Sequence, residues 1–158
     1  MAEPKTHSLL LADEAATIAL ARRLAGVVRP GDVIALEGDL GAGKSSLARG
    51  LIRALAGEDE DVPSPTFTLV QCYDCVSVTI WHFDLYRLDK PDDALELGIE
   101  DAFAEGVSLI EWPDRLGPWL PRDRLTLRLT AGPSETSRQA TLSGGPAWND
   151  RWGAIFGD

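Results

Sequence analysis

The first part of the chain contains two apolar patterns with different spacing. Thr17, Leu20 and Leu24 recur at helical spacing after Asp13, a residue typical of helix N-caps, so we expect a helix there. Residues 33–36 are uniformly apolar, which favours a short strand buried on both faces of a parallel sheet.

The next segments predict a helix followed by a hairpin. Leucines recur every fourth position at Leu47, Leu51 and Leu55, which indicates a helix with one buried face. Residues 66–70 and 76–80 are rich in β-branched residues and predict two strands. A tight connection at Tyr73-Asp74 makes an antiparallel hairpin the expected arrangement.

The second half of the chain continues the alternation of helices and strands. Pro91 begins a predicted helix with an apolar repeat every four residues, and Gly106 ends it. A mostly apolar strand follows at 107–111. Residues 125–130 alternate between apolar and polar types, and 139–142 are expected to pair with them.

The last segment, about 144–158, has an apolar pattern of its own. Trp148, Trp152, Ile155 and Phe156 share one helical face. This face could dock on the rest of the chain or on a partner protein, and the cost of an exposed apolar cluster favours intramolecular packing.

Length and composition predict one globular domain over residues 1–158. Hydrophobic residues make up 44% and charged residues 25% of the 158 positions, and no linker is evident. No apolar run approaches the ~20 residues needed to span a bilayer. The first residues lack the apolar core of a secretory signal. We therefore expect a cytoplasmic protein without a membrane role.

The acidic balance argues against direct nucleic-acid binding. The formal net charge is −10 and the isoelectric point is near 4.6. Because Lys and Arg supply most of the non-specific affinity for phosphate backbones, a role on nucleic acid would need a partner. Cys72 and Cys75 form a C-x-x-C pair, but no second ligand pair accompanies them, so ordinary reduced cysteines are expected.

The strongest chemical signal lies between the strand at 33–36 and the leucine-rich helix. Its eight residues match the phosphate-binding pattern G-x-x-x-x-G-K-[ST]: Gly38, Asp39, Leu40, Gly41, Ala42, Gly43, Lys44 and Ser45. Backbone N–H groups of such a loop surround an anion, and the helix directs its positive end at that anion. Lys44 should reach the terminal phosphates and be largely solvated in the empty site, and Ser45 should bind Mg²⁺. The flanking strand and helix predict an α/β, three-layer P-loop NTPase-like sheet flanked by helices, with an antiparallel hairpin component.

Two later segments could supply acids to this loop. Alternation from His82 through Asp84 to Tyr86 predicts an imidazole, a carboxylate and a phenol on one surface. A P-loop site needs an acid for Mg²⁺, which singles out Asp84. Glu111 ends the strand at 107–111, where ligands of open α/β sheets bind.

The order and spacing of these motifs resemble the bacterial TsaE family, also called YjeE. The resemblance covers Gly31 to about Arg115 and rests on the loop, Ser64-Pro65-Thr66-Phe67, His82-x-Asp84-x-Tyr86-Arg87, Leu97-Gly98 and Ile110-Glu111-Trp112. Its members are small ATPases required for threonylcarbamoyladenosine formation on tRNA.

The resemblance implies ATP and Mg²⁺ as cofactors and assigns roles to matching residues. Lys44, Asp84 and Glu111 would be catalytic, and Ser45, Asp84 and Glu111 would lie at the metal. Thr66 matches a segment thought to sense the terminal phosphate. The expected nucleotide contacts are Asp39, Leu40, Gly41, Ala42, Gly43, Lys44, Ser45, Ser46, Thr66 and Trp112.

Three functions compete for this sequence. The resemblance implies an ATPase that works with TsaB-like and TsaD-like proteins and meets tRNA only through that complex. No obvious arginine finger lies within or beside the loop, so this ATPase is expected to be slow alone and stimulated by partners, unless Arg87 acts in cis. The alternatives are a small P-loop kinase acting on a small-molecule acceptor and, less favoured, a GTP-dependent switch suggested by Asp89-Lys90-Pro91-Asp92.

Overall fold

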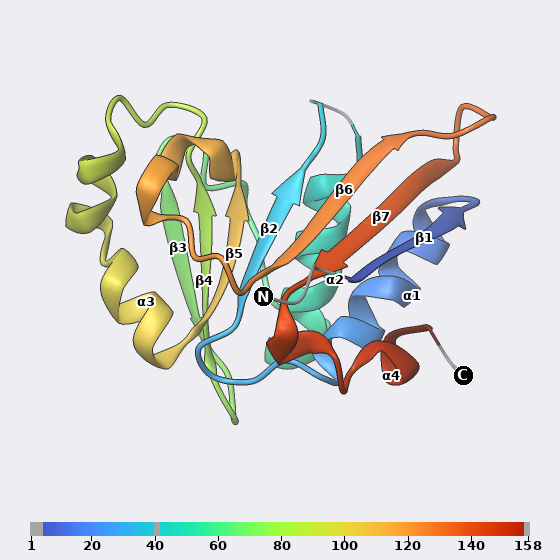
Figure 1. Ribbon diagram of the computed structural model, residues 1–158, viewed down its shortest axis with the longest axis horizontal. Helices are drawn as coiled ribbons and strands as arrows, with labels where there is room; N and C mark the ends of the chain where they lie inside the picture. Colours follow the sequence, from blue (N-terminus) through green and yellow to red (C-terminus); the bar gives the residue numbers. More distant parts are fainter. Residues whose placement is uncertain (1–4, 40–41, 157–158) are drawn as a thin grey trace.

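A seven-stranded mixed sheet forms the centre of the molecule (Figure 1). The computed structural model describes residues 5–39 and 42–156. The strands lie in the order β1-β7-β6-β2-β5-β4-β3. Their bounds are β1 Lys5–Leu11, β2 Val33–Glu37, β3 Val70–Asp74, β4 Thr79–Asp84, β5 Val107–Glu111, β6 Leu125–Ala131 and β7 Arg138–Gly144.

The middle of the sheet is parallel and its two margins are antiparallel. Strands β6, β2, β5 and β4 run in the same direction, whereas β3 pairs antiparallel with β4, and β7 pairs antiparallel with both β6 and β1. The carboxyl ends of the four parallel strands therefore meet at one edge, where the loop after β2 begins.

Helices cover both faces of this sheet. The α-helices are α1 Glu14–Ala25, α2 Lys44–Ala56, α3 Ile99–Glu105 and α4 Trp152–Phe156; the short 3₁₀ helices are η1 Pro91–Leu97, η2 Pro113–Trp119 and η3 Pro146–Trp148. Asp13 caps α1 by accepting a hydrogen bond from the N–H of Ala16 at 2.9 Å.

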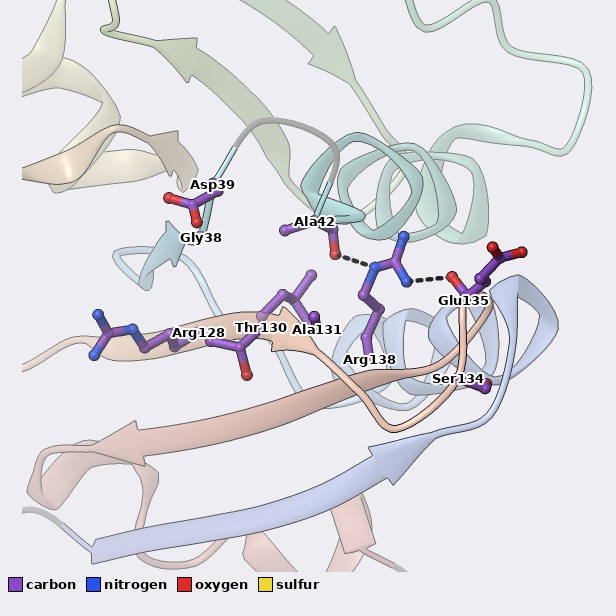
Figure 2. Close-up of a pocket in the computed structure, with 10 residues that line it drawn as sticks. Gly38, Asp39, Ala42, Arg128, Thr130, Ala131, Ser134, Glu135 and Arg138 are labelled. Atoms are coloured by element: carbon purple, nitrogen blue, oxygen red, sulfur yellow. Dashed lines mark hydrogen bonds between the residues drawn. The ribbon is translucent and has the colours of Figure 1, made fainter.

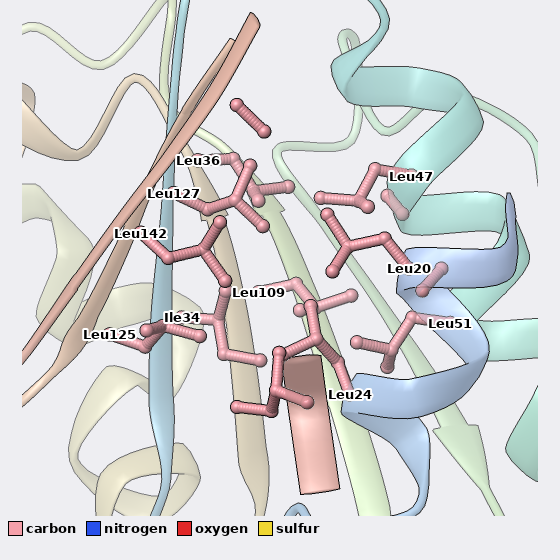
Figure 3. Packing of buried hydrophobic residues seen from close by; sticks show 14 of the residues in the cluster. Leu20, Leu24, Ile34, Leu36, Leu47, Leu51, Leu109, Leu125, Leu127 and Leu142 are labelled. Carbon is pink, nitrogen blue, oxygen red and sulfur yellow. The ribbon is translucent and has the colours of Figure 1, made fainter. Parts of the chain in front are cut away.

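Alternate residues of the central strands enter two separate hydrophobic clusters. Ile34, Leu36 and Leu109 pack with leucines of α1 and α2 on one face (Figure 3). Val33 and Ile110 point to the other face, against α3 and the 3₁₀ helices. This arrangement confirms the predicted three-layer α/β fold.

The C-terminal segment packs within the chain. Trp148, Trp152 and Ile155 are buried in the same cluster as α1 and α2. Arg151 forms a buried ion pair with Asp32, next to the start of β2, and its guanidinium lies 4.1 Å from the centre of the Trp148 ring. The tail therefore lies near the amino end of β2.

The hairpin is confirmed, but its strands lie further along the chain than predicted. Residues 66–69 form a turn, closed by a hydrogen bond from Leu69 N–H to the Pro65 carbonyl at 2.7 Å. Leu69 has a φ of 68°, which is not an extended conformation, and β3 begins at the next residue. The connection between β3 and β4 lies at 75–78, so the prediction of a turn at Tyr73-Asp74 was wrong.

Two further differences concern local pattern. The predicted helix over 91–106 is divided by Gly98, whose φ of 84° separates η1 from α3. Strand β1 was not predicted, because its exposed, mixed sequence acquires strand structure only by pairing with β7. Among the described residues, no helix has both the length and the apolar character needed to cross a bilayer.

Candidate nucleotide-binding site

The glycine-rich loop lies where the sequence places it, between β2 and α2. Gly38 has a φ of 142°, and a Cβ there would lie 2.6 Å from the carbonyl oxygen of Leu129. Gly43 precedes α2 with a φ of 102°. Both positions therefore require glycine. Leu40 and Gly41, two of the predicted nucleotide contacts, lie outside the described residues.

Lys44 is buried, which corrects the expectation that it is solvated. Its side chain lies over Trp112, with Nζ 4.0 Å from the ring centroid, and the residue is only 5% exposed. Within the described part of the chain, Nζ has no hydrogen-bond partner. The backbone of Trp112 is left-handed at φ 58° and ψ 52°. A buried ammonium that lacks a hydrogen-bond partner fits a site for an anion.

Asp84 and Glu111 end neighbouring parallel strands and lie side by side in register. Both are 6% exposed. Asp84 accepts hydrogen bonds from the Thr66 hydroxyl at 3.1 Å and from the Tyr86 N–H at 3.2 Å. Glu111 accepts one from Nε2 of the buried His82 at 2.8 Å. These contacts fix the orientation of both carboxylates.

The loop and the two acids line one cavity of about 380 Å³. The Ser45 hydroxyl and the carboxylates of Asp84 and Glu111 supply oxygen atoms to its lining, and oxygen is the ligand type that Mg²⁺ prefers. The residues lining this cavity are Glu14, Gly43, Lys44, Ser45, Ser46, Ser64, Thr66, Asp84, Glu111, Trp112 and Arg138. We call it the phosphate cavity, and the individual roles of its residues stay predictions.

Asp39 and Ala42 line a neighbouring pocket instead. Figure 2 shows them opposite Arg128 and Arg138, which come from strands β6 and β7. Ser46 lines the phosphate cavity and donates a hydrogen bond to Glu14 at 3.3 Å. The predicted contacts are thus distributed over two adjoining spaces.

The predicted single surface of His82, Asp84 and Tyr86 is only partly formed. Strand β4 ends at Asp84, so Tyr86 leaves the alternation; it is 46% exposed, with its ring 4.9 Å from that of Trp112. Arg87 lies 4.7 Å from the Phe67 ring centroid.

Sequence reasoning missed three residues of the phosphate cavity. Glu14 lies in the first turn of α1, and no sequence pattern connected it with the loop. The hydroxyl of Ser64 lies 2.8 Å from that of Thr66. Arg138 comes from β7, and its Nε donates a hydrogen bond to the Ala42 carbonyl of the loop. No local pattern indicated it, since β7 is remote from the loop in sequence.

The two cysteines are free, as expected. Partial desolvation raises the pKa of both thiols, and nearby carboxylates, with Asp74 common to both, raise the pKa values further. Cys72 is exposed, whereas Cys75 packs against the core. Because the thiolate is the form that binds metal or attacks, this environment is typical of unreactive cysteines.

A glycine-rich loop that joins a buried parallel strand to a helix, beside two acids at the same sheet edge, defines the P-loop class of α/β proteins. Residues 11–140 match the family model described as threonylcarbamoyl adenosine biosynthesis protein TsaE. The chain therefore belongs to the TsaE family.

Individual relatives agree with this assignment. A tRNA threonylcarbamoyladenosine biosynthesis protein TsaE from Rickettsia felis is 44% identical over 106 residues, which cover 67% of this chain and 62% of that protein. The protein of the same name from a Nostoc species is 40% identical over 141 residues, covering 85% and 84% of the two chains. The crystal structure of YdiB from Bacillus subtilis superposes with a TM-score of 0.79 at 28% identity, covering 98% of this chain and 97% of YdiB.

Proposed function

We propose that residues 1–158 form a single ATPase domain that binds ATP with Mg²⁺ and hydrolyses it as a component of the tRNA threonylcarbamoyladenosine machinery. The observation that carries the proposal is the buried Lys44 ammonium, which lacks a hydrogen-bond partner among the described residues and borders a cavity lined by two carboxylates. A triphosphate would supply the missing acceptors. Membership of the TsaE family supports the assignment to tRNA modification.

We propose separate roles for the residues of the phosphate cavity, based on their charge and position. Lys44 would neutralise the terminal phosphates, and Ser45 and Asp84 would hold Mg²⁺, whose positive charge would stabilise the negative charge that develops on the phosphate. His82 holds the Glu111 carboxylate in one orientation by a hydrogen bond of 2.8 Å. Glu111 would thereby be held ready to orient the attacking water or to help Ser45 and Asp84 hold the metal ion.

We propose that Thr66 senses the terminal phosphate. Its hydroxyl donates to Asp84 at 3.1 Å from a turn that precedes β3. Binding of the triphosphate beside Asp84 would offer this hydroxyl a new acceptor, and the turn could then change position. We propose that this change communicates the nucleotide state to a partner.

We further propose that the partners are TsaB-like and TsaD-like proteins in the cytoplasm. With a net charge of −10, the chain would meet tRNA only through their complex. Turnover by the isolated chain should be slow, because catalysis at such sites depends on charge stabilisation that a partner can complete.

Phosphate release from ATP tests the proposal directly. The chain is assayed with Mg²⁺ alone, then with the TsaB-like and TsaD-like proteins of the same organism, with modified tRNA as a second readout. Slow release without an acceptor and faster release with partners are expected. If phosphate transfer requires a small-molecule acceptor, the kinase function is favoured instead. Equal rates of phosphate release with and without partners, in a complex shown to form, would reject activation by partners.

A further inference from the structure

Arg138 connects the sheet to the glycine-rich loop from two strands away. It is the first residue of β7, and β6 lies between β7 and the loop strand β2. Its Nε donates a hydrogen bond to the Ala42 carbonyl at 3.2 Å (Figure 2). The side chain therefore passes over the end of β6 to reach the loop.

The guanidinium is also held at its other end. Nη1 donates to the carbonyls of Glu135 and Ser137 at 3.0 and 2.8 Å. Ser137 is itself buried, and its hydroxyl accepts a hydrogen bond from the Ser134 N–H at 2.9 Å. Because the planar group contacts carbonyls on both sides, its orientation is fixed by the β6–β7 hairpin.

The hydrogen bond from Arg138 to the Ala42 carbonyl also sets the direction of the next N–H group in the loop. The carbonyl of Ala42 and the N–H of Gly43 belong to one planar trans peptide, so they point in opposite directions. Arg138 draws the carbonyl toward β7, which turns the N–H of Gly43 away from β7. Gly43 has a φ of 102° and lines the phosphate cavity together with Lys44 and Arg138.

We propose that Arg138 is a positioning residue for the phosphate-binding loop. Arg138 holds the Ala42 carbonyl away from the cavity, so that the N–H of Gly43 points toward the bound phosphates. This N–H is therefore oriented as a hydrogen-bond donor before the nucleotide binds. The inference rests on the proposed function, since it assigns this geometry to nucleotide phosphates.

The test compares ADP affinity in three variants by calorimetry, with Gly43 observed by NMR. Arg138→Gln removes the planar fork and the charge, and Arg138→Lys keeps the charge alone. Arg122→Gln is the matched control, because Arg122 is an exposed arginine that precedes β6, at the opposite end of this strand from the phosphate cavity. The melting temperature of each ligand-free protein reports on folding.

We expect Arg138→Gln to weaken ADP binding roughly 10- to 100-fold, the range for hydrogen bonds that involve a charged group. Arg138→Lys should lose nearly as much, and Arg122→Gln should change affinity less than about threefold, because an exposed charge is screened. The downfield shift of the Gly43 amide proton on ADP binding should be lost in both Arg138 variants.

Three results would overturn the inference. The first two are wild-type ADP affinity in Arg138→Gln and an unchanged Gly43 amide shift in that variant. The third is wild-type ADP affinity in Arg138→Lys, which would show that a positive charge at this position is enough for binding. If Arg138→Gln has a lower melting temperature than the wild-type protein, the ADP affinity and the Gly43 shift of Arg138→Lys test the inference instead. If the wild-type chain binds neither ADP nor ATP, the proposed function fails and this inference fails with it.

Discussion

Lys44 carries the clearest consequence at the scale of the single residue. Its buried ammonium has a ring contact to Trp112 but, among the described residues, no hydrogen-bond partner. Lys44→Met keeps the apolar stem and removes the charge. We expect triphosphate affinity to fall roughly 10- to 100-fold, while the free energy of unfolding of the ligand-free protein stays equal or rises.

Calorimetry with a non-hydrolysable ATP analogue and urea unfolding measure the two effects of Lys44→Met. Trp112→Leu serves as a comparison, since it removes the ring beneath the ammonium and leaves the charge. Wild-type nucleotide affinity in folded Lys44→Met protein would contradict the assignment of the loop.

The two acids give a second prediction at this scale. Asp84→Asn and Glu111→Gln keep the shape of the side chain and remove its negative charge. Each should therefore lower the rate of ATP turnover by about tenfold or more, with a smaller effect on the free energy of unfolding. The measurement is single-turnover phosphate release over a range of Mg²⁺ concentrations. Asp84→Asn should also shift the Mg²⁺ dependence upward. Unchanged turnover in both variants would place the metal acid elsewhere.

At the scale of the element, Gly98 decides where one predicted helix becomes two. Its φ is 84°, and a Cβ there would lie 2.9 Å from the Trp81 ring. Gly98→Ala should therefore destabilise the protein by about 1–2 kcal/mol from the backbone alone, and the clash adds to this cost. Gly153→Ala is the control, because a Cβ at Gly153 meets nothing within 4 Å. Urea unfolding that gives equal midpoints for the two variants would contradict this account.

At the scale of the whole molecule, a buried ion pair between Arg151 and Asp32 links the C-terminal segment, about 144–158, to the amino end of β2. Arg151 and Asp32 are 3% and 8% exposed, and Arg151 Nη1 also donates to the Val27 carbonyl at 3.2 Å. Asp32→Asn leaves a buried guanidinium without its counter-charge, so we expect a loss of about 3–5 kcal/mol.

A double-mutant cycle checks the prediction for this ion pair. Asp32→Asn combined with Arg151→Met should cost less than the sum of the single changes, because the unpaired charge is then gone. Nucleotide affinity of the folded variants should stay at the wild-type value, since the phosphate cavity lies at the carboxyl end of β2. Additive losses would show that the pair is not coupled.

The sequence by itself determined the α/β class and the local units of the site. The apolar run before the glycine-rich loop and the leucine repeat after it are signals within a few residues, and both elements form as predicted. Glu111 was predicted at the end of a strand and lies there, whereas Asp84, predicted in a segment that follows a strand, is the last residue of β4. The two acids come together because parallel strands bring their carboxyl ends to one edge. Their roles at the metal stay predictions.

Tertiary structure decided what depends on groups distant in sequence. The burial of Lys44 on Trp112, the pairing of β1 with β7 and the reach of Arg138 to Ala42 join residues separated by tens of positions. Local propensity also failed at 66–69, where a turn replaced a β-branched run. Propensity and periodicity report on neighbours along the chain, whereas these features are fixed by packing and hydrogen bonds between strands and loops that meet only in the fold.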